Sequence, residues 1–177
     1  MPRHIRFGLI VLLLLVWSGI SLAAHASHSC PAGSTSIHLS DGDNNVSYGS
    51  GRQCVDANAG SDTVTLGAGD DLALGEEGND RLEGREDQDV LWGGSGGDTV
   101  LGGNGSDPTM VGGFGNDTIK GEGADDSVIA GLGLDTLQGN AGMSDSLVHC
   151  HDGQNDDVDG FEFHTHQLTN CSDTNMD

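Results

Sequence analysis

The chain is poor in basic residues. Only 6 of its 177 residues are Lys or Arg, against 28 Asp and Glu, so its formal net charge is −22 at pH 7. A surface this acidic repels phosphate backbones and anionic headgroups. We therefore expect no nucleic-acid partner and, once the signal segment described below is removed, no membrane partner.

Large apolar side chains are also scarce. Aromatic residues make up 4% of the sequence, and beyond residue 26 only 27 of 151 residues are Leu, Ile, Val or Phe. Together with the charge, this places the chain on the disordered side of the usual compositional boundary. Glycine is abundant instead, with 30 residues. Either the chain is a solvated acidic polymer, or a cation neutralises its carboxylates and supplies the folding energy that a thin core cannot.

The N-terminus has the pattern of a secretory signal. A basic start is followed by an apolar run over residues 7–17, and Ala24-His25-Ala26 provides the small-x-small sequence that a signal peptidase accepts. The run is too short for a transmembrane helix, which needs about 20 apolar residues. We expect cleavage after Ala26 and an extracellular, secreted protein.

Aspartate recurs with a period of nine through the middle of the chain, with one-residue insertions near residues 108–111 and 140–144. Glycines precede most of these aspartates, and a mostly aliphatic residue stands two positions after each. The pattern predicts rows that each consist of a turn, a carboxylate and a short strand. The ten aspartates are Asp62, Asp71, Asp80, Asp89, Asp98, Asp107, Asp117, Asp126, Asp135 and Asp145.

Three rows carry the full repeat: GGSGGDTVL at 93–101, GGNGSDPTM at 102–110 and GGFGNDTIK at 112–120. They match the nonapeptide G-G-x-G-x-D-x-U-x. Over about residues 57–148 the chain thus resembles the RTX, or hemolysin-type, calcium-binding repeat family. The resemblance implies an all-β fold, a parallel β-roll (β-solenoid) of two short-stranded parallel sheets in which two rows make one turn.

The resemblance also implies that Ca²⁺ lies between stacked turns, in at most eight sites. Its ligands would be the ten aspartates and the carbonyl groups of the glycine loops. The glycines that match the motif are Gly94, Gly96, Gly103, Gly105, Gly113 and Gly115. We expect fewer than eight occupied sites, because Arg85 and Asp87 replace glycines in the row at 84–92.

Four cysteines flank the repeats, two in an N-terminal cap over residues 27–56 and two in a C-terminal cap over residues 149–177. Three pairings are possible. We favour Cys30–Cys54 and Cys150–Cys171, each closing one end of the solenoid. DSLVHC at 145–150 and HQLTNC at 166–171 share a frame, which predicts that the last two cysteines lie on neighbouring rungs.

The C-terminal cap has further features. Asp156 and Val158 resemble an additional degenerate rung, and Phe161 and Phe163 could plug the open end. Four histidines form two pairs, each with one residue between its members. If the two pairs lay close together in the fold, their imidazoles could bind zinc or copper, but we favour the interpretation that they are polar surface residues. They are His149, His151, His164 and His166.

We predict a non-catalytic protein, because no Ser/His/Asp or Cys/His set stands out. The favoured function is a secreted calcium-binding β-roll, folded by Ca²⁺, that serves as a structural or interaction module. The alternative is an adhesive protein that binds a protein or surface through an apolar column on one sheet, unless the chain's own ends cover it. Ice binding through outward threonines is less favoured. The column consists of Leu74, Trp92, Met110, Ile129 and Val148. The insertion near Val111 could instead turn Met110 inward and Val111 outward.

Overall fold

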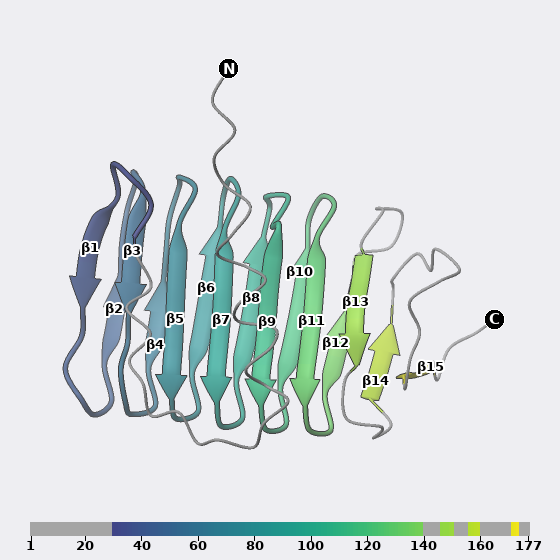
Figure 1. The fold of residues 1–177 in the computed structure, drawn as a ribbon. Helices are drawn as coiled ribbons and strands as arrows, with labels where there is room; N and C mark the ends of the chain where they lie inside the picture. Colours follow the sequence, from purple (N-terminus) through teal and green to yellow (C-terminus); the bar gives the residue numbers. More distant parts are fainter. Residues whose placement is uncertain (1–29, 140–145, 151–155, 160–170, 174–177) are drawn as a thin grey trace.

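The chain folds into a solenoid with two layers of parallel strands (Figure 1). The computed structural model describes residues 30–139, 146–150, 156–159 and 171–173. From β1 to β14, strands of the two sheets alternate along the chain and run in opposite directions (Figure 1), and the last strand, β15, pairs with β14 in the same sheet. Within the described residues, no helix is long and apolar enough to span a bilayer.

Seven strands form the first sheet, sheet A, and eight form the second, sheet B. Sheet A contains β1 (Thr35–His38), β3 (Gln53–Asp56), β5 (Leu72–Glu77), β7 (Val90–Ser95), β9 (Thr109–Phe114), β11 (Ser127–Leu132) and β13 (Ser146–Cys150). Sheet B contains β2 (Asn45–Ser47), β4 (Thr63–Thr65), β6 (Arg81–Arg85), β8 (Thr99–Gly103), β10 (Thr118–Glu122), β12 (Thr136–Gln138), β14 (Asp156–Asp159) and β15 (Cys171–Asp173).

The register follows the nine-residue period of the sequence. Neighbouring strands of one sheet are two rows apart, so Leu82 of β6 pairs with Val100 of β8. Val100 then pairs with Ile119 of β10, one residue further along, because the insertion near Val111 lengthens that turn. The predicted β-roll is confirmed.

A single file of aliphatic side chains fills the space between the sheets. Most rows contribute the residue two positions after the aspartate, which is fully buried. Since strands alternate their side chains between the two faces, the residues on either side of it face outward. The buried core residues between residues 55 and 137 are Val55, Ala57, Val64, Leu66, Ala73, Leu82, Leu91, Val100, Met110, Ile119, Val128, Ala130 and Leu137.

The solenoid extends beyond the repeats at both ends. β1, β2 and β3 lie inside the predicted N-terminal cap and pair in the same parallel fashion. At the other end, Val158 of β14 pairs with Leu137 and is 1% exposed. The additional rung expected at Asp156 and Val158 is therefore present.

The Cys30–Cys54 disulfide is confirmed, and it joins the segment before β1 to β3. The expectation that Cys150 and Cys171 lie on neighbouring rungs is wrong. Cys150 ends β13 in sheet A, whereas Cys171 begins β15 in sheet B. The shared frame failed because the C-terminal rows are longer than nine residues. Their pairing stays a prediction, since it depends on side chains outside the described ones.

The predicted apolar column is changed at two places. Met110 is fully buried in the core, and Val111 takes its place opposite Trp92 and Ile129. This is the inward turn of Met110 that the insertion allowed. At the C-terminal end His149, rather than Val148, pairs with Ile129, because β13 is irregular there.

Several predictions concern residues outside the described ones. These are the signal segment over residues 1–26, the ligand Asp145, the proposed plug of Phe161 and Phe163, and the side chains of the four C-terminal histidines.

Candidate metal centre

The periodic aspartates form two ladders, one along each edge of the solenoid. In each ladder a backbone N–H donates a hydrogen bond to Oδ1 of the aspartate one turn later, with N···O distances of 2.7–3.0 Å. The first ladder runs Asn44, Asp62, Asp80, Asp98, Asp117, Asp135 and Asp156. The second runs Gln53, Asp71, Asp89, Asp107 and Asp126.

One oxygen of each carboxylate thus has a structural role, as the acceptor that connects one turn to the next. The ladder carboxylates are buried, at 0–3% exposure. For seven of them the second oxygen, Oδ2, is also buried and has no hydrogen-bond partner: Asp62, Asp71, Asp80, Asp89, Asp98, Asp107 and Asp117. A buried ionised oxygen without a partner is costly, so these atoms favour a bound cation.

Burial shifts the ionisation of these carboxyls. Desolvation, together with the carboxylates one turn before and after in the same ladder, raises the pKa of Asp89 and Asp117 to about 7. Desolvation is the larger of these two causes. Desolvation likewise raises the pKa of Asp80 and Asp107 to about 6. Without a cation, part of each ladder would hold protons at neutral pH.

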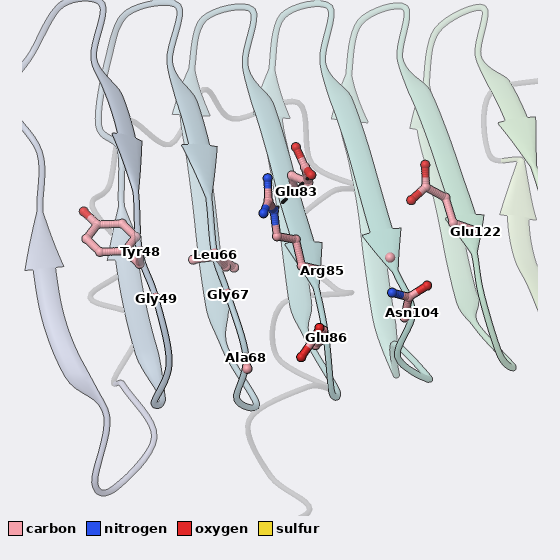
Figure 2. A pocket seen from close by; sticks show the side chains of 11 residues that line it. Tyr48, Gly49, Leu66, Gly67, Ala68, Glu83, Arg85, Glu86, Asn104 and Glu122 are labelled. Atoms are coloured by element: carbon pink, nitrogen blue, oxygen red, sulfur yellow. Dashed lines mark hydrogen bonds and ion pairs between the residues drawn. The ribbon is translucent and has the colours of Figure 1, made fainter.

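Of the described arginines, none forms an ion pair with a ladder carboxylate. Among the described residues the arginine ion pairs are with Asp70 and Glu83, which lie outside the ladders. Arg85 Nε lies 3.1 Å from Glu83 Oε1 at an open groove of about 470 Å³ that Tyr48 and Glu122 also line (Figure 2). Arg85 stands where the repeat has glycine, in the row of Asp89. Its side chain forms an exposed ion pair with Glu83, which is not a ladder residue.

The first glycine of a row gives the carboxylate its space. A Cβ on Gly93 would lie 2.5 Å from Asp98 Oδ2 and 2.6 Å from the carbonyl oxygen of Gly112, which belongs to the next turn. A carboxylate oxygen and a backbone carbonyl thus converge on the site that an alanine methyl would fill. Equivalent contacts to a ladder Oδ2 exist at Gly75, Gly84, Gly102, Gly112 and Gly121.

The second and fourth residues of a row need the left-handed backbone that glycine adopts without strain. Of the six glycines predicted from the motif, five have φ between 118° and 133°: Gly94, Gly96, Gly103, Gly113 and Gly115. Gly105 is required for another reason, because a Cβ there would collide with the carbonyl oxygen of Asp87. Arg85 and Asp87 adopt φ of 89° and 74°, so their row keeps the turn.

The donor set fits calcium better than a transition metal. Within the described part of the chain, no three His, Cys, Asp or Glu side chains gather around one point as a metal site would need. Any ion must therefore draw many of its ligands from backbone carbonyls. Calcium accepts such mixed carbonyl and carboxylate oxygens, six to eight at a time. The ladder aspartates and the glycine-loop carbonyls are the groups that would hold it.

The sequence reasoning missed two ladder members and left a third out of the predicted ligands. Asp156, expected on an additional rung, continues the first ladder beyond Asp135 after 21 residues instead of 18. Asn44 and Gln53 begin the two ladders, and their backbone N–H groups donate to Asp62 and Asp71. Both ladders therefore begin at a residue with an uncharged side chain.

Comparison with known proteins agrees with this geometry. The family model of the RTX calcium-binding nonapeptide repeat matches residues 55–82, 74–107 and 109–137. No curated protein and no solved structure matches the chain. The matched ranges contain nine of the ten predicted aspartate ligands and all six predicted glycines. The segment from residue 55 to residue 137 is therefore built from RTX calcium-binding nonapeptide repeats.

Proposed function

We propose that this protein is a secreted calcium-binding module whose folding is driven by calcium and whose role outside the cell is structural or one of interaction. One observation carries the proposal: seven buried ladder carboxylates each have an Oδ2 atom with no hydrogen-bond partner. The repeat aspartates act as ligands in this proposal and have no catalytic role.

The physical reason for calcium-driven folding is charge accumulation. Each ladder stacks carboxylates at the spacing of successive parallel strands, about 4.8 Å. The core between them is a single file of aliphatic side chains, which offers little to offset this repulsion and the entropy of the chain. A cation between turns would neutralise neighbouring carboxylates, and its binding free energy would become folding free energy.

A calcium titration tests the proposal. The mature chain, treated with EDTA at pH 7.5, is followed by circular dichroism as Ca²⁺ is added. Extracellular calcium modules bind at about 0.1–1 mM, and in that range we expect a cooperative change from a disordered to a β spectrum. A β spectrum that is already complete in EDTA at this pH would overturn the proposal.

A matched pair of variants locates the effect. Asp98→Asn removes one ladder charge, whereas Glu77→Gln removes one charge from an exposed residue on the same edge of the solenoid. Asp98→Asn should raise the calcium midpoint at least about threefold, and Glu77→Gln should leave it nearly unchanged. Equal midpoints for the two variants would mean that only net charge matters.

Secretion is supported by two features, the signal pattern before Ala26 and the Cys30–Cys54 disulfide, which suits an oxidising compartment. When the full chain is expressed in a secreting host, the protein recovered from the culture medium should begin near Ser27. N-terminal sequencing that finds intact residues 1–26 would contradict this part.

The alternatives stay predictions. Adhesion would use the outer face of sheet A, where Leu74, Trp92, Val111 and Ile129 follow one another on adjacent strands. Leu74 and Val111 are buried, at 4% and 8% exposure, so Trp92 and Ile129 are the partly exposed members of this column. Ice binding would use outward threonines of sheet B. These line up on three adjacent strands, and Arg81 interrupts them next to Thr99. A thermal hysteresis assay separates the two.

A further inference from the structure

The N-terminal end of sheet A carries a side-chain arrangement that the calcium function does not use. We propose that Ser36, His38 and Asp56 form a nucleophile, base and orienting acid that hydrolyse small unhindered esters. Ser36 and His38 lie on β1 before the matched repeats, and Asp56 lies on β3 at the start of the first matched range. None of the three belongs to a calcium ladder. No family match assigns them a role.

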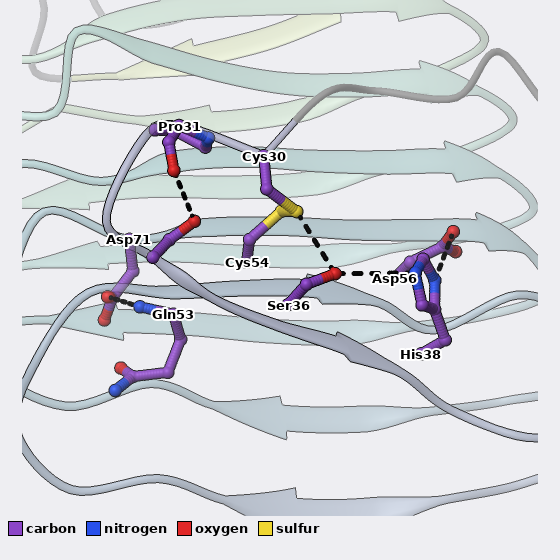
Figure 3. Close-up of a disulfide and its surroundings, with 9 residues drawn as sticks. Cys30, Pro31, Ser36, His38, Gln53, Cys54, Asp56 and Asp71 are labelled. Carbon is purple, nitrogen blue, oxygen red and sulfur yellow. Dashed lines mark hydrogen bonds and ion pairs between the residues drawn. A yellow bond between two sulfur atoms is a disulfide. The ribbon is translucent and has the colours of Figure 1, made fainter.

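The three side chains form a continuous chain of contacts (Figure 3). Ser36 Oγ lies 3.4 Å from His38 Nε2. His38 Nδ1 lies 3.3 Å from Asp56 Oδ2. With its proton on Nδ1, the imidazole donates to the carboxylate and presents Nε2 as the acceptor for the serine hydroxyl. This is the order of contacts that nucleophilic serine catalysis requires.

The backbone holds these side chains on one face. Ser36 and His38 are two residues apart on β1, so both point to the same side of the strand. His38 pairs directly with Asp56 in the parallel register of β1 and β3. The Asn58 N–H donates to Asp56 Oδ1 over 3.2 Å, which orients the carboxylate, and the Cys30–Cys54 disulfide ties the segment before β1 to β3.

Backbone N–H groups are available to stabilise an oxyanion. The Thr35 N–H donates to the Arg52 carbonyl and the Leu39 N–H donates to the Asp56 carbonyl. Odd-numbered residues of β1 therefore face β3, and the N–H groups of Ser36 and His38 point away from it. In the described residues β3 is the one strand paired with β1. The Ser36 N–H thus makes no hydrogen bond to β3, and in this proposal it is the donor to the oxyanion that forms in acyl transfer.

The proposed reaction is ester hydrolysis in two steps. Ser36 Oγ attacks the acyl carbon while its proton moves to His38 Nε2. The alcohol then leaves with that proton, and an acyl ester remains on Ser36. Water attacks this ester, again giving a proton to His38, which returns it to Ser36 Oγ as the carboxylic acid departs.

Exposure sets the substrate class. The His38 side chain is 68% exposed and that of Asp56 is 24% exposed, so the site is an open surface. It offers no enclosure to select a bulky group, and the observations favour short acyl chains on good leaving groups.

A serine-directed fluorophosphonate probe tests the proposal on the full mature chain in saturating calcium, with the modified residue located by mass spectrometry. Labelling should fall on Ser36 and disappear in Ser36→Ala. His38→Gln should slow it about 10²-fold, and Asp56→Asn about tenfold or more. Hydrolysis of p-nitrophenyl acetate should follow the same order.

Ser47→Ala is the matched control, because Ser47 is an exposed serine on β2 of the other sheet. It should label and hydrolyse like the wild type. Circular dichroism and an intact Cys30–Cys54 bond verify the fold of each variant. Absent labelling, labelling spread evenly over exposed serines, or Ser36 labelling that is indifferent to His38→Gln would overturn the proposal.

Discussion

Gly93→Ala perturbs the space around a ladder carboxylate without removing any charge. The new methyl would lie 2.5 Å from Asp98 Oδ2, 2.6 Å from the Gly112 carbonyl oxygen and 2.8 Å from Asp98 Cβ. The φ of Gly93 lies outside the left-handed region, so the backbone conformation itself admits alanine. The effect therefore comes from crowding the carboxylate and the next turn.

Overpacking of this kind typically costs about 1–3 kcal/mol. At about 2–4 °C of melting temperature per kcal/mol for a chain of this size, Gly93→Ala should lower the melting temperature by about 2–12 °C. The displaced carboxylate should also weaken calcium binding, so the calcium midpoint should rise.

Gly97→Ala in the same turn is the control. Its methyl would meet the Asn116 carbonyl oxygen at 3.3 Å and Asn79 Oδ1 at 3.6 Å, and its φ also lies outside the left-handed region. Reduced freedom of the unfolded chain offsets this mild crowding by about 0.4–1 kcal/mol. Thermal melting by circular dichroism, in saturating calcium, compares the two variants. If they melt within about 1 °C of each other, the proposed role of Gly93 is wrong.

Three further outcomes are expected. The calcium-free protein should show more β structure by circular dichroism at pH 4 than at pH 8, since burial raises the pKa of Asp89 and Asp117 to about 7, and stability that depends on their protonated form is lost as pH rises through that value; more β structure at pH 8 would contradict it. Reduction of Cys30–Cys54, with a sequence separation of 24, should lower the free energy of unfolding by about 3 kcal/mol and increase hydrogen exchange first in β1; uniform loss of protection would count against a local cap. Met110→Ala should destabilise the protein by about 2–5 kcal/mol in a denaturant titration, because Met110 is fully buried; a loss below about 1 kcal/mol would place Met110 outside the core.

The resemblance of the nonapeptide rows to the RTX repeat was enough to predict the β-roll. Since two rows make one turn, the spacing of Asp80 and Asp98 already implied their stacking, which the structure shows. The glycine pattern likewise predicted the left-handed turns at residues such as Gly94 and Gly113. These features are local, and the repeat encodes them directly.

Two kinds of feature were harder to predict: which face of a strand a side chain lies on after an insertion, and which residues pair across distant strands. One inserted residue reverses which neighbour faces the core, so Met110 turned inward and Val111 outward. Asp156 joined its ladder after an irregular interval. The contact of His38 with Asp56 arises between β1 and β3, which precede the full repeats. The signal for it in the sequence is the spacing alone: Ser36 and His38 are two residues apart, and Asp56 follows His38 by 18 residues, the length of one turn.

The most direct test of the central claim is a crystal structure of the mature protein grown in calcium, with anomalous scattering used to locate the ions. The account predicts anomalous peaks between stacked turns, within about 2.3–2.6 Å of ladder Oδ2 atoms, and first of all at Asp98 and Asp117, whose Oδ2 atoms have no hydrogen-bond partner. A structure with the same fold, saturating calcium and no anomalous peak along either ladder would contradict it.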